Sequence, residues 1–233
     1  MTQRALITGA SRGIGLEFVR QLAERGARVY ATCRTPARAT GLQQIAERSG
    51  GRVCIYELDV ADPASIARLR ASLHADTDGL DLLINNAGVY PRGEHFGSLD
   101  PDLMISILRI NSLGPVLVTQ ALLELLTAGN APKVINITSQ LGSLARKTGG
   151  GSYSYSGSKA LLNMYTRAMA AELRPMGIIA VPVHPGWVQT DMGGSGAPLT
   201  VRESVQALLS LIDHLQMGDS GRYLQWDGSE LPW

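Results

Sequence analysis

Two side chains in the middle of the chain have the types and the spacing needed for acid–base chemistry. Tyr155 and Lys159 are four residues apart, and the apolar run that follows predicts a helix, on which such residues are neighbours. A free tyrosine hydroxyl titrates near ~10, and a neighbouring lysine cation lowers that pKa. Lowering it by about 3 units takes roughly 4 kcal/mol, so Lys159 would need help from a cofactor's positive charge. The pair would then suit proton transfer to or from a carbonyl or alcohol oxygen.

Taken alone, this pair is more often an ordinary surface tyrosine and lysine, and the upstream sequence changes that balance. A short apolar strand over 4–8 runs into a glycine-rich turn and then into a helical pattern from Ile14 to about Arg25. This arrangement points free backbone N–H groups at a phosphate, and glycines let the phosphate come close. A tight turn without a ligand is the alternative. We expect a dinucleotide to contact Gly9, Ser11, Arg12, Gly13, Ile14 and Gly15.

The second strand, 27–32, indicates which dinucleotide. It ends at Cys33 and Arg34. At this point of a dinucleotide fold an acidic residue binds the ribose 2′-hydroxyl, whereas an arginine accommodates a 2′-phosphate. Arg34 offers a forked cation, and Arg12 in the glycine turn could add a second. Either arginine alone is better explained as a solvated surface charge, but together they predict NADP(H) in preference to NAD(H).

Further strands are expected over 52–58, 80–84, 133–139, 178–183 and 222–225, with helices between them, including one over 36–48. This alternation predicts a single doubly wound α/β domain with a parallel sheet of about seven strands and helices on both faces. Ligands bind such folds at the carboxyl ends of the strands. The polar and glycine-containing segments at 59–60, 85–88, Ser139 and 184–186 all fall at that edge.

The chain resembles the short-chain dehydrogenase/reductase family, in its single-domain Rossmann branch, over essentially its whole length. Residues 8–15 match the TGxxxGxG turn, 85–88 match NNAG, Tyr155 to Lys159 match YxxxK, and 185–190 match PGxxxT. Asn111 and Ser139 fall at the intervals expected for the other two catalytic positions. Within the family, 139–143, 186–192 and 227–233 resemble the C-factor and sniffer-like carbonyl reductase group.

The resemblance implies a role for each catalytic position. Tyr155 would be the general acid in reduction and the base in oxidation. Ser139 would bond the substrate oxygen, Lys159 would lower the tyrosine pKa and hold the nicotinamide ribose, and Asn111 would anchor a water linking Lys159 to solvent. The implied cofactor contacts are Thr190 and Val188 for the carboxamide, Asp59 and Val60 for adenine, Asn85 and Ala87 for the adenosine ribose, and the motif positions Gly88, Pro185 and Gly186.

Composition excludes several other classes. The 233 residues, 1–233, fit one domain, and a net charge of +1 with interspersed signs implies no nucleic-acid or anionic-membrane surface. Two cysteines cannot build a disulfide framework, no signal-peptide pattern is present, and no uninterrupted apolar stretch approaches ~18 residues. No cluster of histidines, cysteines and carboxylates has metal-ligand spacing. We therefore expect a cytoplasmic protein without a membrane span or metal site.

Three more features concern the surroundings of the site. Pro115 lies four residues after Asn111 in an expected helix over 104–126, so it would free the carbonyl of residue 111 for a water. The helix after Lys159 is apolar most of the way round, which favours a homodimer or homotetramer over a monomer. The glycine-rich segment 191–198 is a candidate lid. Candidate substrate contacts are Tyr90, Leu141, Trp187 and Met192.

These expectations combine into one reading of function. The chain would be an NADPH-dependent oxidoreductase that transfers a hydride between the nicotinamide and a small carbonyl or alcohol. The alternative is a dinucleotide-binding signalling or regulatory protein of the C-factor type with incidental catalysis. A dehydratase or epimerase of the larger sugar-nucleotide branch fits poorly, because the glycine spacing differs and there is no room for a substrate domain.

Overall fold

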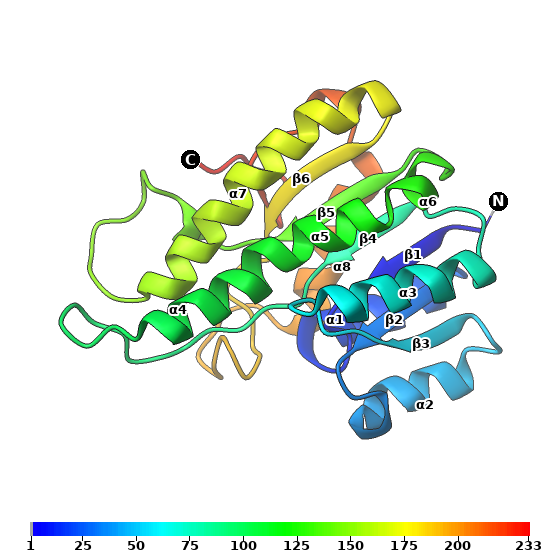
Figure 1. The fold of residues 1–233 in the computed structure, drawn as a ribbon, viewed down its shortest axis with the longest axis horizontal. Coiled ribbons are helices and arrows are strands. Elements are labelled where there is room, and N and C mark those ends of the chain that lie inside the picture. Colours follow the sequence, from blue (N-terminus) through cyan, green and yellow to red (C-terminus); the bar gives the residue numbers. More distant parts are fainter. Residues whose placement is uncertain (1) are drawn as a thin grey trace.

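Short runs of apolar residues form seven strands that pair in one parallel sheet. The computed structural model describes residues 2–233, and its strand order is β3-β2-β1-β4-β5-β6-β7 (Figure 1). The strands are β1 (Arg4–Ile7), β2 (Arg28–Cys33), β3 (Val53–Glu57), β4 (Leu82–Asn85), β5 (Lys133–Ile137), β6 (Ile179–His184) and β7 (Leu224–Gln225). This topology confirms the expected doubly wound Rossmann-type α/β fold.

Helices connect successive strands and cover both faces of the sheet. They are α1 (Gly13–Glu24), α2 (Thr40–Arg48), α3 (Pro63–Asp76), α4 (Pro101–Leu108), α5 (Gly114–Ala121), α6 (Leu123–Thr127), α7 (Tyr153–Leu173) and α8 (Val201–His214). Short 3₁₀ turns cover Pro36–Arg38, Gln140–Gly142, Arg174–Met176 and Met217–Asp219, and a π-helical turn covers Arg109–Leu113. The helix expected over 36–48 is therefore a 3₁₀ turn followed by the shorter α2.

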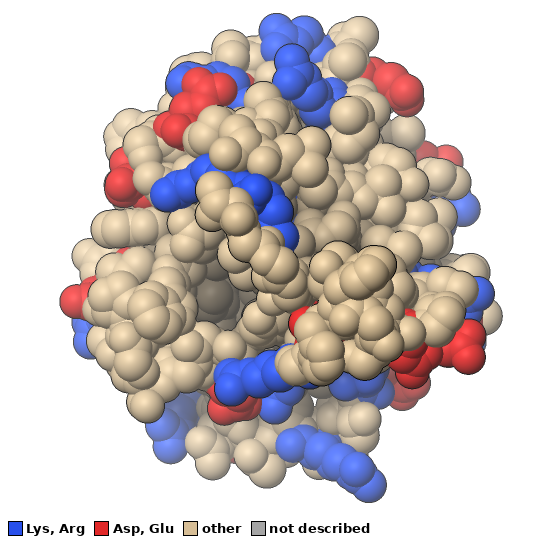
Figure 2. Space-filling view, turned by 90° about the vertical axis from the view of Figure 1, so that its left-hand side faces the viewer, with Lys and Arg blue, Asp and Glu red and all other residues tan. Residues whose placement is uncertain are grey.

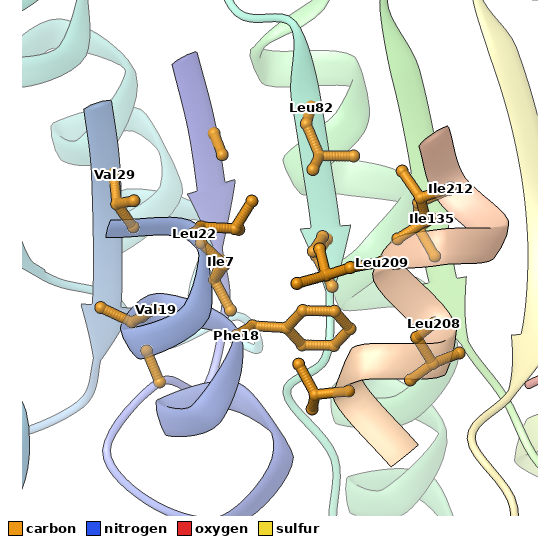
Figure 3. Close-up of a cluster of buried hydrophobic side chains, with 14 of the residues drawn as sticks. Ile7, Phe18, Val19, Leu22, Val29, Leu82, Ile135, Leu208, Leu209 and Ile212 are labelled. Atoms are coloured by element: carbon orange, nitrogen blue, oxygen red, sulfur yellow. The ribbon is translucent and has the colours of Figure 1, made fainter. Parts of the chain in front are cut away.

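The core has two layers because neighbouring side chains on a strand point to opposite faces. On β1, Ile7 joins one apolar cluster while Leu6 joins the other. The first cluster lies under α1 and α8, where Phe18 and Leu209 pack against Ile7 and its neighbours on the sheet (Figure 3). The second cluster lies under α3, α5, α6 and α7. Both faces are thus buried, as a parallel sheet requires.

The carboxyl ends of the strands share one edge of the molecule. Strands β1 and β4 pair with each other, and the strand order reverses between them. It continues through β2 and β3 on one side and through β5, β6 and β7 on the other. This switch point is where open α/β sheets bind ligands. The long loops that follow β4, β5 and β6 project from the same edge, on the left of Figure 1. Figure 2 looks onto that edge and shows a hollow with mainly uncharged walls and basic side chains at several points around it.

The expected continuous helix over 104–126 is wrong in one respect. It is broken into α4, the π-helical turn Arg109–Leu113, α5 and α6. In the π turn the Gly114 N–H bonds the Arg109 carbonyl, five residues back, so one extra residue is accommodated before Pro115. Such π-bulges often occur at functional sites, and Asn111 lies inside this one. The prediction from Pro115 concerned the carbonyl of residue 111, and the structure adds a wide turn around that residue.

One helical stretch of the described chain, Pro101–Ala121, is long and apolar enough to cross a membrane by its length and composition alone. In the fold this stretch is α4, the π turn and α5. The first two pack against α7, and α5 packs against α3 and α7. Its apolar character is therefore partly explained by contacts within the domain.

Candidate active site

A cavity of about 500 Å³ lies at the carboxyl edge of the sheet and runs from the glycine turn to the Tyr155–Lys159 pair. Most residues expected at a cofactor site line it. These are Gly9, Ser11, Arg12, Gly13, Ile14, Arg34, Asp59, Val60, Ala87, Gly88, Tyr155, Lys159, Pro185, Thr190 and, from the substrate candidates, Met192. Segments that are far apart in the sequence thus form one continuous wall.

The glycine turn between β1 and α1 explains why side chains are absent there. Gly9 has a φ of +66°, and an added Cβ would lie 2.8 Å from the Ala87 Cα. A Cβ on Gly15 would lie 2.4 Å from the Gly9 carbonyl oxygen. Gly13 has a φ of +55° and lines the cavity itself. Gly9 and Gly15 let backbone segments pack closely, and Gly13 leaves the space at the start of the helix open. A pyrophosphate is held in such a space. The residues present therefore fit a bound dinucleotide.

Tyr155 and Lys159 occupy successive turns at the beginning of α7, and both are buried, at 8% and 4% exposed. The Lys159 Nζ lies 5.8 Å from the centroid of the Tyr155 ring and donates to the Ile137 carbonyl at 2.8 Å. Ser139 follows β5 and is also 8% exposed. It interacts with the Tyr155 side chain, so the three groups predicted to act together do lie together.

Burial sets the charge state of this pair. It raises the pKa of Tyr155 to about 12, and the polar Ser139 side chain nearby offsets part of that rise. Burial lowers the pKa of Lys159 to about 8. Among the residues that the structure describes, no carboxylate forms an ion pair with Lys159. The chain alone therefore keeps the tyrosine as a phenol at neutral pH, in line with the expectation that Lys159 does not suffice.

Asn111 holds the loop that borders the cavity. Its Nδ2 donates to the Val89 carbonyl at 2.9 Å and to the Ser158 hydroxyl at 3.0 Å. Its Oδ1 accepts the Val89 N–H at 2.9 Å. The side chain is fully buried and does not line the cavity. Its position links the loop after β4 to α7, one residue from Lys159, and the π turn allows this reach.

The expected role of Asn85 needs correction. Its side chain points into the interior, where Nδ2 donates to the Asn136 Oδ1 at 2.8 Å and to the Thr119 hydroxyl at 3.1 Å. It is 2% exposed and does not line the cavity. Asn86 lines the cavity instead, and its Nδ2 donates to the carbonyls of Thr8 and Gly9. The first amide of the pair therefore supports the sheet, and the second supports the glycine turn.

The two arginines in the cavity wall behave differently. Arg34 lines the cavity and forms no ion pair among the described residues. Arg12 also lines the cavity, but its guanidinium donates to the Asp191 carboxylate at 3.0 Å, and both side chains are mostly exposed. Asp59 lines the wall nearby, with its Oδ1 accepting the Ala61 N–H at 2.9 Å.

The four substrate candidates differ in their position relative to the cavity. The Tyr90 ring lies 4.6 Å from the Tyr155 ring, between centroids. Trp187 is 56% exposed, and its indole N–H donates to the Gly193 carbonyl, so it belongs to the lid segment. Leu141 is 39% exposed beside the Ser139 turn. Of the four candidates, Met192 lines the cavity, whereas Tyr90, Leu141 and Trp187 do not.

The candidate lid 191–198 is a folded turn. The Gly193 N–H donates to the Thr190 hydroxyl at 3.0 Å, and a Cβ on Gly193 would lie 2.0 Å from the Val188 carbonyl oxygen. The Gln189 side chain donates to the Ala197 carbonyl at 3.0 Å. Val188 is buried and pairs with Leu199, and Gly186 packs against Leu199. Neither Val188 nor Gly186 lines the cavity. Both support the segment through packing away from the cavity, as Gly15 supports the glycine turn.

Several cavity residues were missed by sequence reasoning. Thr138 precedes Ser139 at the end of β5, and its hydroxyl donates to the Asn163 Oδ1 of α7 at 2.7 Å. Its place beside a predicted site residue at a strand end was the available signal. Cys33, Asn86, Gln189 and Asp191 also line the cavity and lie in segments that the sequence had marked, whereas Leu58, Val89, Ile110, Ile137 and Val201 were missed. Within residues 2–233, no group of three or more histidines, cysteines or carboxylates could hold a metal ion.

Comparison with known proteins agrees with this geometry. The family model for short chain dehydrogenases matches residues 3–198. The chain is 47% identical over 157 residues to the C-signal of Myxococcus xanthus, which covers 67% of this chain and 95% of that protein. It is 38% identical to an NADPH-bound carbonyl reductase from chicken fatty liver, with a TM-score of 0.93 and coverage of 100% and 99%. The carbonyl reductase Sniffer of D. melanogaster is 32% identical, with a TM-score of 0.94 and full coverage of both chains.

The chain therefore belongs to the short-chain dehydrogenase family, and the resemblance seen in its motifs is confirmed. It is an NAD(P)-dependent oxidoreductase. The relatives carry different names. The substrate and the roles of single residues are therefore inferred from the geometry of this chain's own site.

Proposed function

We propose that the protein is an NADPH-dependent carbonyl reductase in which Tyr155 supplies the proton. The observation that carries the proposal is the single cavity in which the glycine turn, Arg34 and the buried Tyr155–Lys159 pair meet. A bound NADPH would supply the hydride that reaches the carbonyl carbon. The substrate would be a small aldehyde, ketone or quinone, in keeping with the mainly apolar substrate candidates, of which Met192 lines the cavity.

The chain's own groups would then manage the charge that develops on the substrate oxygen. The Tyr155 and Ser139 hydroxyls both donate towards that oxygen, and the Tyr155 proton moves to it. Lys159 is tied to the Ile137 carbonyl through one N–H, so its remaining N–H bonds are available to a ribose hydroxyl. Asn111 keeps the loop at Val89 in register with α7. We also propose the water-anchoring role implied by the resemblance.

The cofactor contacts form part of the proposal. The glycine turn would hold the pyrophosphate, Asp59 and Val60 the adenine, and Thr190 with the Val188 backbone the carboxamide. Arg34, which has a free guanidinium and lines the cavity, would bind a 2′-phosphate. This arginine and the lack of a carboxylate at Cys33 favour NADP(H) over NAD(H). Solved relatives with NADPH or NADP bound support the same choice.

A symmetric homo-oligomer is also proposed. Met164 on α7 is 64% exposed, and Ile105 on α4 is 49% exposed on the neighbouring helix. Large exposed apolar side chains on packed neighbouring helices favour association. A single domain over 1–233 in the cytoplasm completes the proposal, because one sheet organises the described chain and Cys33 and Cys54 are both free, which suits a reducing compartment.

The regulatory reading remains as a second candidate, because one relative at 47% identity is named a signal. Tyr155→Phe separates the two readings. The variant should bind NADPH with unchanged affinity, measured by quenching of tryptophan fluorescence, and should lose turnover on every carbonyl that the wild-type protein reduces. Tight NADPH binding by the wild-type protein with no turnover on a panel of small carbonyls would overturn the reductase proposal and favour the regulatory one. Replacing Arg34 by serine should weaken NADPH binding more than NADH binding.

A further inference from the structure

Helix α7, which carries Tyr155 and Lys159, begins without a capping side chain of its own. Its N-cap residue, Ser152, has φ 52° and ψ 38°, in the left-handed region, and its hydroxyl makes no bond to the first turn. That hydroxyl lies 2.8 Å from the Tyr90 hydroxyl instead. A serine at this position usually accepts an N–H of the second or third helical residue. The first turn of α7 therefore needs an acceptor from elsewhere.

Glu94 supplies that acceptor from a loop 60 residues away in the sequence. Its Oε2 accepts the Ser154 N–H at 3.0 Å, and its Oε1 accepts the Ser154 hydroxyl. Ser154 is the second residue of the helix and is 2% exposed, and Glu94 is itself partly buried, so water has little access to the contact. A carboxylate at this end also meets the positive pole of the helix dipole.

The same loop touches the catalytic tyrosine candidate directly. Tyr90 packs its ring against Tyr155 and its hydroxyl against Ser152. Tyr155 is therefore held from two sides, through its ring by Tyr90 and through the backbone of the preceding residue by Glu94. In Figure 1 the loop that leads into α4 reaches the start of α7 at the left of the molecule.

We propose that Glu94 is a positioning residue for Tyr155 and acts as the N-cap of α7 from a distant loop. The inference rests on the proposed function, in which Tyr155 donates the proton. Removing the carboxylate loosens the turn that places the Tyr155 hydroxyl beside Ser139. Lys159 lies one turn further along and keeps its bond to the Ile137 carbonyl. The loss should therefore fall on turnover and leave cofactor binding nearly unchanged.

Glu94→Ala tests this in the full-length protein with a carbonyl that the wild-type enzyme reduces. The variant should lower kcat by about tenfold while changing the KM for NADPH by less than about twofold. Glu94→Gln keeps one acceptor oxygen at the same reach, so it should restore most of the lost kcat. The Ser154 amide, followed by residue-resolved hydrogen exchange, should exchange at least about tenfold faster in Glu94→Ala than in the wild type.

Asp100→Ala is the matched control. Asp100 also caps a helix with a carboxylate, as the local N-cap of α4, accepting the N–H of Asp102 at 2.9 Å and that of Leu103 at 3.3 Å. Its loss should lower the denaturation midpoint by a similar amount but leave kcat within about twofold of the wild type. This control separates the loss of a helix cap in general from the positioning of Tyr155.

Two results would overturn the proposal. One is a kcat that falls equally in Glu94→Ala and Asp100→Ala. The other is an unchanged exchange rate of the Ser154 amide in Glu94→Ala, which would mean that Glu94 does not cap α7 in solution. A wild-type protein that reduces no carbonyl would refute the proposed function, and the Ser154 exchange rate would still decide whether the cap exists.

Discussion

Burying Lys159 without a carboxylate partner should cost stability in a way that depends on pH. Its pKa is lowered from 10.5 to about 8 by burial, so the folded chain disfavours the charged form. At pH 7 the lysine is protonated in both the folded and the unfolded chain, and the cost is fully present. As pH rises through 8 the folded protein releases its proton first, so stability rises until the unfolded chain also titrates near 10.5.

The size of the effect follows from the two pKa values. Because one pKa unit corresponds to about 1.4 kcal/mol, the free energy of unfolding of the wild type should rise by roughly 2 to 3 kcal/mol from pH 7 to pH 10 on account of this one group. Other groups titrate over the same range. A Lys159→Met variant shares them, so the difference between the two proteins isolates the lysine.

The assay is urea denaturation of the wild type and of Lys159→Met at pH 7, 8.5 and 10. The variant should be the more stable protein at pH 7 or equal to the wild type, since the lysine's hydrogen bond to Ile137 offsets part of its burial. The stability of the wild type relative to the variant should then increase by roughly 2 to 3 kcal/mol by pH 10. Lys147→Met, which removes an exposed lysine, controls for the loss of a positive charge.

A stability difference between wild type and Lys159→Met that stays constant within about 0.5 kcal/mol from pH 7 to pH 10 would refute this reasoning. It would show that the ammonium group is well solvated or paired in the folded protein. The range stops at pH 10 because burial raises the pKa of Tyr155 to about 12, and its titration would oppose the lysine effect above that point.

Two further substitutions test the ion pair of Arg12 and the hydrogen bond to the Ser139 carbonyl. Asp191→Asn should release Arg12 from its exposed ion pair and tighten NADPH binding by about two- to fivefold, with little effect on NADH, as measured by fluorescence titration; weaker NADPH binding would show that Asp191 helps to form the site. Tyr223→Phe removes the hydroxyl that donates to the Ser139 carbonyl and should cost about 1 kcal/mol in urea denaturation. No loss of stability would mean that the Gly142 N–H, which bonds the same carbonyl, suffices.

The fold and the site edge were predictable from local patterns in the sequence. Most strands are short apolar runs, and the carboxyl ends of β1, β4, β5 and β6 are marked by a glycine, an amide or a hydroxyl, whereas β2 and β3 are followed by Arg34 and Asp59. Because these signals are local, they can be recognised without knowledge of long-range contacts. Helix irregularities were less predictable. Pro115 predicted that the carbonyl of residue 111 would lack its helical bond. The extra residue of the π turn depends on how α4 and α7 pack, which no local pattern predicts.

The orientation of Asn85 was, by contrast, within reach of the sequence. Side chains alternate along β4, so Leu82 and Ile84 enter one cluster while Leu83 enters the other. Asn85 must then share the face of Leu83, under α5, where it bonds Thr119. Only beyond the strand, at Asn86, does the chain turn over the cavity. Applying the period of two to the last residue of the strand would have removed it from the cofactor site.

The contacts that hold Tyr155 in place could not be predicted from the sequence. Glu94, Ser152 and Ser154 carry no motif, and a loop glutamate is ordinarily assigned to solvent. Their pairing depends on the left-handed backbone at Ser152, which turns its hydroxyl towards Tyr90 and leaves the Ser154 N–H to Glu94. The motif residues specify what chemistry the site can perform. The loop that fixes their geometry needs only one acceptor that reaches the start of α7, and for that reason no sequence motif marks it.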